Sequence, residues 1–345
     1  MRHGPRLLPE FRDPHPGRFD LASAALSLVS VLAVIYGVKR LAEEGFGSQP
    51  GLAIAAGLIV GVVFLRRQSR LTDPMIDLRL SRVPAFSASL AANALALFAV
   101  LGVDLFIAQY LQLVLGMGPF EAGLWTLPSA AGFIVGSMLA PVIARTVRPG
   151  FLVAGGLAVT ALGLAMPTQV RADSGLAALV TGSVVMALGA AQVVTLSTDL
   201  IVGAAPPERA GAASGISETG TELGGALGIA ILGSLGTAVY RSEVSDAVPV
   251  GVPAHSADAV RDTLGGALGV ADRVPVGVID AATGAFAHGL EVAAVTSAVL
   301  MLGMAVLAAL LLREPRADPH PDPRPELEQD EAVGGRPDVA PALAS

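Results

Sequence analysis

The sequence contains no cysteine, a single lysine and few charged residues of either sign. Without cysteine, disulfide bonds, thiol catalysis and cysteine-based metal sites are excluded. Charged residues make up 15% of the 345 positions, whereas a soluble globular domain carries about 25%. A concentrated basic patch of the kind that binds nucleic acid is also missing. These absences exclude an ordinary soluble domain and a nucleic-acid-binding protein.

Signatures of enzymes are missing as well. The sequence has no HExxH zinc motif and no nucleophile elbow, and its glycine runs lack the lysine of a phosphate-binding loop. His288 and Glu291 lie three residues apart, but two ligands are too few for a metal site. We therefore expect no enzymatic activity, no cofactor and no bound metal.

Long apolar stretches dominate what is present. Hydrophobic residues make up 53% of the chain, and crossing a bilayer core of roughly 30 Å takes about 20 of them in one helix. Eight stretches qualify: Leu21–Val38, Gly51–Leu65, Ala85–Leu113, Ala122–Ala144, Gly150–Met166, Leu176–Val202, Ala212–Val239 and Thr283–Leu312. The pattern predicts an all-α polytopic membrane protein with about eight transmembrane helices.

The distribution of arginine predicts the orientation of these helices. Lysine and arginine are enriched in cytoplasmic loops. If the N-terminus is cytoplasmic, arginine-rich loops fall on the cytoplasmic side at nearly every alternation along the chain. Their basic residues include Arg145 and Arg148 in one loop and Arg209 in another. We expect a multi-pass protein of the cell membrane, surrounded by lipid, with both termini in the cytoplasm.

Four stretches, Leu7–Asp20, Thr72–Phe86, Gln109–Leu124 and Ala205–Leu235, occur in this order along the chain. They resemble one branch of a known family, the fourteen-span drug:proton antiporters of the major facilitator superfamily. TDPMIDLRLSRVPAF (Thr72–Phe86) resembles a cytoplasmic loop of that branch, and QYLQLVLGMGPFEAGL (Gln109–Leu124) resembles the turn after its ninth helix. The region from Ala205 to Leu235 is similar to its twelfth and thirteenth helices, and Leu7–Asp20 to the link that leaves its sixth helix. The resemblance implies two linker helices followed by the six C-terminal helices.

The resemblance also implies that the first six helices are missing. Transporters of this superfamily bind their substrate between two halves that move around it, so one half cannot transport alone. The chain is then either a truncated or mis-started copy, or it pairs with a polypeptide that supplies the N-terminal half. In APVIARTVRPGFL (Ala140–Leu152), a weak repeat of a family loop signature, Arg145 and Arg148 remain to bind the ends of neighbouring helices.

This interpretation divides the chain into consecutive parts. They are a cytoplasmic segment (1–18), two linker helices (19–70), a cytoplasmic loop (71–84), a six-helix bundle (85–312) and a disordered, acidic, proline-rich cytoplasmic tail (313–345). One long external loop, 240–282, interrupts the bundle, and spaced apolar residues predict a short amphipathic helix at Ala254–Val270 within it.

Two glutamates in an otherwise apolar stretch are the leading functional candidates. Glu218 and Glu222 are four residues apart, so they project from one helical face. A rise of about 1.5 Å per residue places Glu222 near the membrane midplane. Carboxylates at that depth usually serve proton or ion pathways, and two of them together can hold a proton and release it when a cation arrives. The alternative is that both are protonated and hydrogen-bonded to Ser217, Thr219 and Thr221.

Further polar residues lie within the predicted helices. Asp104, followed by Gln109 and Gln112 toward the outer mouth, either binds a cation or proton or is a carboxylate near the interface. Asp199 lies close to a cytoplasmic helix end, where an ion pair with Arg209 or Arg145 is favoured over transport.

Two other patterns have different interpretations. His288 and Glu291 share a face of the last helix and form a weak candidate proton relay. Glycines spaced four apart, such as Gly211 and Gly215, or Gly224 and Gly228, predict close helix packing rather than ligand binding.

Two functions of different kinds fit these observations. The first is a secondary transporter that exports hydrophobic or cationic small molecules in exchange for protons. The second is a non-transporting membrane protein, either a truncated relic or a packing subunit that needs a partner half.

Overall fold

The structure is a computed structural model that describes residues 20–44, 47–71, 83–167, 175–206, 210–249 and 251–312. Throughout these ranges the regular structure is helical, which confirms the predicted all-α class. Seven of the helices are long and apolar enough to cross a membrane, and α5 is apolar but shorter. The expectations for the N-terminal segment, most of the 71–84 loop, Arg209 and the tail lie outside the described residues.

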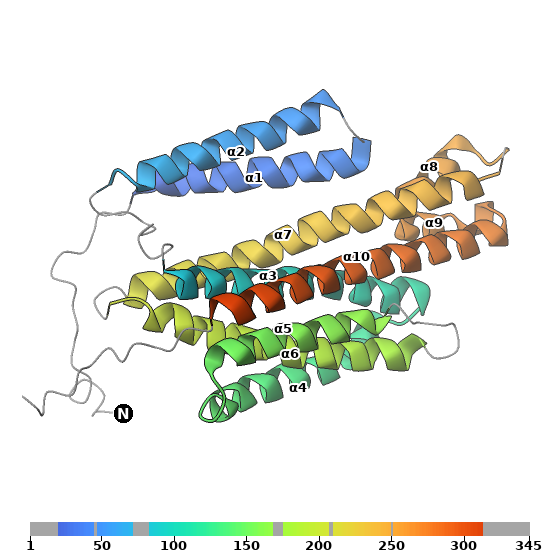
Figure 1. Ribbon diagram of the computed structural model, residues 1–345. Coiled ribbons are helices and arrows are strands. Elements are labelled where there is room, and N and C mark those ends of the chain that lie inside the picture. Colours follow the sequence, from blue (N-terminus) through green and yellow to red (C-terminus); the bar gives the residue numbers. More distant parts are fainter. Residues whose placement is uncertain are drawn as a thin grey trace, which may run out of the picture. The chain divides into compact units, whose positions relative to one another are not determined.

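The elements follow the predicted apolar stretches closely (Figure 1). In chain order they are α1 (Leu21–Glu44), α2 (Ser48–Gln68), α3 (Pro84–Gln109), the π-helical turn η3 (Tyr110–Val114), α4 (Pro119–Ile143), α5 (Pro149–Ala165), α6 (Gly175–Gly203), α7 (Ala210–Val244), η6 (Ser245–Ala247), α8 (Ala254–Asp262), α9 (Leu264–Gly269), η7 (Ala271–Arg273) and α10 (Val276–Leu311). Proline at the start of α3, α4 and α5 fits the first helical turn, where the missing N–H has no partner in any case.

Six helices, α3 to α7 and α10, form a bundle. Helix α6 packs against α3, α4 and α5, and α10 packs against α3, α5 and α7. Helices α1 and α2 form an antiparallel hairpin. Large apolar side chains are exposed on the outer faces, among them Ile134 and Met138 of α4 and Val299 and Val306 of α10. Exposed apolar surface of this extent is typical of helices that face lipid.

Helices α3 and α7 are in backbone contact. A β-carbon at Gly224 would collide with the carbonyl oxygen of Ala94, and one at Gly228 would collide with that of Phe98. Only glycine allows two helices to approach this closely, which confirms the packing prediction for this pair. Gly211 and Gly215 differ, because a β-carbon at either would meet no described atom within 4 Å.

The loop predicted over 240–282 is helical at both ends, because α7 and α10 extend into it. At 35 residues, α7 is about 52 Å long, well beyond a bilayer core of about 30 Å. Tyr240, predicted to begin the loop, is buried, and its hydroxyl donates to the carbonyl oxygen of Val260 at 2.7 Å. Figure 1 shows α7 and α10 continuing past α5 to the end where α8 and α9 lie.

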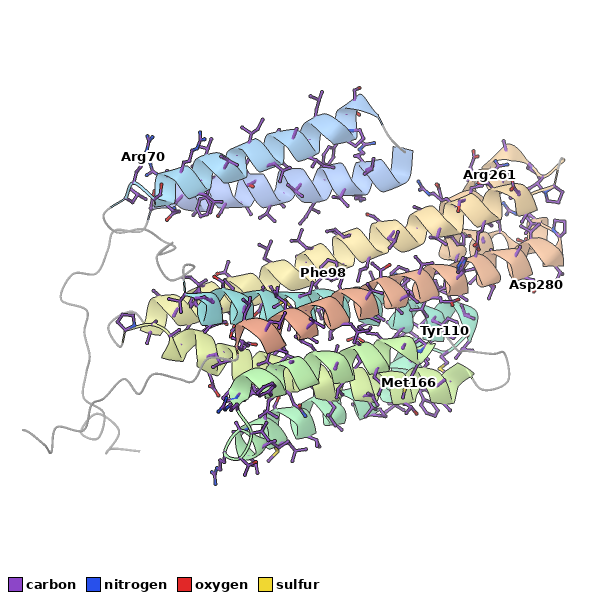
Figure 2. The ribbon with its side chains drawn as sticks, in the orientation of Figure 1. Arg70, Phe98, Tyr110, Met166, Arg261 and Asp280 are labelled. Atoms are coloured by element: carbon purple, nitrogen blue, oxygen red, sulfur yellow. The ribbon has the colours of Figure 1, made fainter. Side chains whose placement is uncertain are left out.

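The helix predicted at Ala254–Val270 is two helices. Thr263 separates α8 from α9 with an extended backbone (φ −155°, ψ 157°), and its hydroxyl accepts a hydrogen bond from the Gly266 N–H at 3.0 Å. A threonine at this position satisfies one of the free N–H groups of a helix start, so the chain ends one helix and begins another. Figure 2 shows Arg261 of α8 and Asp280 of α10 at this end of the molecule.

A polar network joins α1 to α2. Arg67 donates to the carboxylate of Asp20 at 3.0 Å and to the Ser23 hydroxyl at 3.2 Å, and Gln68 donates to the same hydroxyl at 2.7 Å. Asp20 also accepts from the Ser23 hydroxyl and from backbone N–H groups of the first turn, so it caps α1. The Ser23 hydrogen bond, with Arg67, holds the pKa of Asp20 below its ordinary value of 3.8.

Candidate functional site

Glu218 and Glu222 lie on one face of α7, as the sequence predicts, and that face is open. Both side chains are exposed, together with Gly215 and Gly211, which lie about one and two turns before Glu218. Among the described residues, neither carboxylate has a hydrogen bond or an ion pair, and the opposite face of the helix packs on α3. The two carboxylates are therefore directed away from the six-helix bundle rather than into its core.

The hydroxyl groups beside this pair do not bond to it. Thr219 and Thr221 donate to backbone carbonyl groups one turn earlier in α7, each at 2.8 Å. Asn93 of α3, which is buried, donates to Ser217 at 3.2 Å and to Thr221 at 2.9 Å. The predicted alternative, in which Ser217, Thr219 and Thr221 hydrogen-bond to both glutamates, is therefore not seen among the described residues.

Asn93 is a site residue that sequence reasoning missed. Its amide joins α3 to α7 directly beneath the glutamate face, and its carbonyl oxygen is buried without a hydrogen bond among the described groups. A hydrogen bond between membrane helices contributes on average about 0.6 kcal/mol. The sequence could have indicated this residue, because an asparagine within an apolar run such as that of α3 needs a polar partner.

The contacts between α3 and α7 fix the level of Asp104 relative to the glutamates. Leu90 lies opposite Gly220, Ala94 opposite Gly224 and Phe98 opposite Gly228, so the two helices run parallel in a constant register. Glu222 is then level with residue 92 of α3. Asp104 lies twelve residues further along, which is about 18 Å at 1.5 Å per residue.

Asp104 lines a cavity of about 270 Å³ between α3, α4 and α6. Trp125, Thr126 and Ser129 of α4 and Ser183 of α6 line the same cavity, along with aliphatic side chains. Asp104 has no hydrogen bond or ion pair with a described residue. Because the cavity lies between α3, α4 and α6, Asp104 is on a different face of α3 from the one that packs on α7.

Gln109 and Gln112 are separated from Asp104 and from each other. Gln109 lines a second cavity, of about 330 Å³, with Phe106, Thr237 and Phe286 from α3, α7 and α10. Gln112 is exposed in the π-helical turn after α3 and donates to the carbonyl oxygen of Ala108, one turn earlier. Of the five candidate residues, Glu218 and Glu222 thus share one face of α7, whereas Asp104, Gln109 and Gln112 lie apart from them and from one another.

The charged residues near the predicted cytoplasmic ends remain apart where they are described. Asp199 is exposed near the end of α6, and it makes no ion pair with Arg145, which is exposed after α4. Arg148 is exposed before α5. A pairing between Asp199 and Arg209 lies outside the described residues.

His288 has a different acidic partner from the predicted one. Its Nδ1 contacts a carboxylate oxygen of Glu243 near the end of α7, and Glu291 takes no part in this contact. Glu243 was missed because the apolar stretch predicted for this helix ends at Val239. Among the described residues, no group of three or more His, Cys, Asp or Glu side chains is arranged to hold a metal ion.

Comparison with known proteins identifies the family of this arrangement. Residues 21–229 match the Major Facilitator Superfamily. The chain is 38% identical over 314 residues to the "Multidrug efflux pump LfrA" of Mycolicibacterium smegmatis, covering 90% of this chain and 62% of that protein.

Two other relatives are more distant. The "Tetracenomycin C resistance and export protein" of Streptomyces glaucescens is 32% identical over 235 residues, covering 68% of this chain and 43% of that protein. The "Methyl viologen resistance protein SmvA" of Salmonella typhimurium is 29% identical over 304 residues, covering 84% and 60%. The chain therefore spans about 40 to 60% of the length of these three relatives.

Proposed function

This chain belongs to the major facilitator superfamily, and from that membership we propose that it forms part of a secondary transporter that exports hydrophobic or cationic compounds in exchange for protons. Relatives named for multidrug efflux and for export support the direction and the class of substrate. The fourteen-span branch, with α1 and α2 as linker helices and both termini in the cytoplasm, is part of this proposal.

The observation that carries the proposal is the open glutamate face of α7. A carboxylate in a membrane-spanning helix is costly to keep unless it binds a proton, a cation or another polar group. Among the described residues, neither Glu218 nor Glu222 has a hydrogen-bond or ion-pair partner, and the adjacent hydroxyl groups are engaged elsewhere. In the proposed cycle Glu222 takes up a proton from outside and loses it to the cytoplasm when a substrate cation is exchanged, and Glu218 shares the proton.

The same face is the surface that we assign to a second helical half. Gly211 and Gly215 leave space beside the glutamates for another helix to approach closely. A second six-helix half, on the same or another polypeptide, would enclose the carboxylates between two bundles and exclude lipid from them. This arrangement favours transport over a role as a packing subunit, because a merely structural face does not require two unpaired acids.

The decisive experiment is proton-driven efflux of a fluorescent cation from membrane vesicles that contain the protein. We expect Glu222→Gln to reduce transport at least about tenfold, because an amide cannot release a proton, and Glu218→Gln to reduce it less. Glu121→Gln, which changes an exposed glutamate at the start of α4, is the matched control and should transport normally. Equal transport by wild type and Glu222→Gln would remove Glu222 from the mechanism.

A further inference from the structure

The Asp104 cavity differs in kind from the glutamate face. It is a recess of about 270 Å³ with one carboxylate, and it lies about 18 Å along the helix axis from the level of Glu222. Its carboxylate has no partner among the described residues. A single unpaired carboxylate in a mostly apolar recess favours a cation.

The hydroxyl groups of this cavity narrow the choice of cation. Thr126 donates to the carbonyl oxygen of Gly123 at 2.8 Å, Ser129 to that of Thr126 at 2.7 Å and Ser183 to that of Val180 at 2.8 Å. All three hydroxyl protons are committed to the backbone, so these groups offer only oxygen lone pairs to a ligand. The cavity therefore presents acceptors from three hydroxyl groups and the Asp104 carboxylate to a ligand that donates.

The rest of the lining suits an apolar body. Trp125 supplies an aromatic face, which attracts cations, and Ile107 and Leu179 supply aliphatic surface. At about 30 Å³ per water molecule, the recess has room for roughly nine non-hydrogen atoms. A bulky planar dye would not fit within it, although a compact part of a larger molecule would.

We propose that the Asp104 cavity binds protonated primary and secondary amines with a compact apolar body, and that it is a substrate site separate from the glutamate pair. An ammonium group with N–H donors satisfies the carboxylate and the hydroxyl acceptors together. A quaternary ammonium group cannot donate and satisfies the charge alone. This assignment rests on the proposed transport function for its role as a substrate site, but the binding itself does not.

The single tryptophan of the chain, Trp125, makes the test specific to this cavity. Three probes without aromatic rings share one body and fit the recess: cyclopentylamine, its N,N,N-trimethyl analogue and cyclopentanol. Each is titrated into the full-length protein in detergent while Trp125 emission is recorded, and equilibrium dialysis of the radiolabelled probes gives the affinities independently. The amine should produce a saturable change and bind at least about tenfold more tightly than either analogue, as a charge-assisted hydrogen bond predicts.

Variants separate this site from general partitioning into detergent. Asp104→Asn should lower amine affinity at least about tenfold, and Ser183→Ala should lower it about threefold while leaving the trimethyl analogue unaffected. Asp280→Asn, the same change at an exposed position of α10, is the matched control and should bind normally. Thermal unfolding identifies any variant that fails to fold, and Asp104→Glu then serves as the conservative replacement.

Two results would overturn the proposal. One is equal affinity for the amine and its trimethyl analogue by dialysis, and the other is unchanged amine affinity in folded Asp104→Asn. Neither measurement uses a pH gradient, so a failure of proton-driven efflux in vesicles leaves the binding result standing. Conversely, absence of amine binding leaves the Glu222 transport test intact.

Discussion

The polar groups in the two halves of α7 differ in whether they have partners within the fold. In the first half of the helix, Glu218 and Glu222 lie on an open face without a described partner. In the last turns, Tyr240 donates to a buried carbonyl group, Arg241 pairs with Asp262 at 3.2 Å and Glu243 contacts His288. Polar groups that are satisfied within the fold serve its stability, and those left open are available for another molecule. The comparison therefore supports our proposal that the first half of α7 is its functional part.

The largest expected effect tests the closed face of α7 against its open face. Gly228→Ala places a methyl group against the Phe98 carbonyl and should destabilise the protein by about 1–3 kcal/mol, because α3 and α7 must move apart. Gly215→Ala, where no described atom lies near, should stabilise it by about 0.5–1 kcal/mol through helix propensity. Thermal unfolding in detergent measures both changes. Effects of the same sign would show that the two faces do not differ.

The next effect concerns the satisfied end of the helix. Tyr240→Phe removes the hydrogen bond to Val260 and leaves a buried carbonyl group unpaired, which should cost about 1 kcal/mol. Hydrogen exchange should increase in α8 and α9 rather than in the first half of α7. Tyr36→Phe, at an exposed tyrosine of α1, is the control and should leave exchange in α8 and α9 unchanged.

A comparable effect is expected at the contact beneath the glutamates. Asn93→Ala removes two hydrogen bonds to α7, each worth about 0.6 kcal/mol on average between membrane helices, and should lower stability by about 1 kcal/mol. Gln112→Ala removes only a bond within its own helix and should have no measurable effect. A larger loss in Gln112→Ala than in Asn93→Ala, measured by thermal unfolding, would contradict this assignment.

The smallest effect is a pH dependence outside α7, in the α1–α2 hairpin. The pKa of Asp20 is lowered, first by the Ser23 hydrogen bond and also by Arg67. The ionised form therefore stabilises the folded state fully above the ordinary pKa of 3.8, and this contribution is lost as the pH falls through the lower folded-state value. Wild type should unfold at a higher temperature than Asp20→Asn at neutral pH, and the difference should shrink below pH 3.8. A constant difference across this range would exclude the carboxylate as its source.

Most of the fold could be predicted from the sequence, since apolar length alone places a membrane helix. The starts of α3, α4 and α5 at Pro84, Pro119 and Pro149 lie within three residues of the predicted stretches. The extended ends of α7 and α10 could not be predicted, because polar residues such as Arg241 and Glu243 resemble a loop until their partners are known. Those partners come from α8 and α10, which are distant in sequence.

The candidate site was predictable only as far as one helix determines it. The shared face of Glu218 and Glu222 follows from their spacing. The separation of Asp104 from Gln109 does not, since it depends on which face of α3 meets α4 and α6 and which meets α7 and α10. The same limit explains the histidine: His288 shares a face with Glu291 on its own helix, yet its contact is with another helix.

The glycine contacts between α3 and α7 have a mechanical consequence. With the two backbones in contact at successive turns, neither helix can slide or roll against the other without steric overlap, so we expect the two to move as one rigid unit. Conformational changes must then occur at the boundaries of this unit. Spectroscopic labels on α3 and α7 therefore provide a fixed reference for measuring displacements elsewhere in the protein.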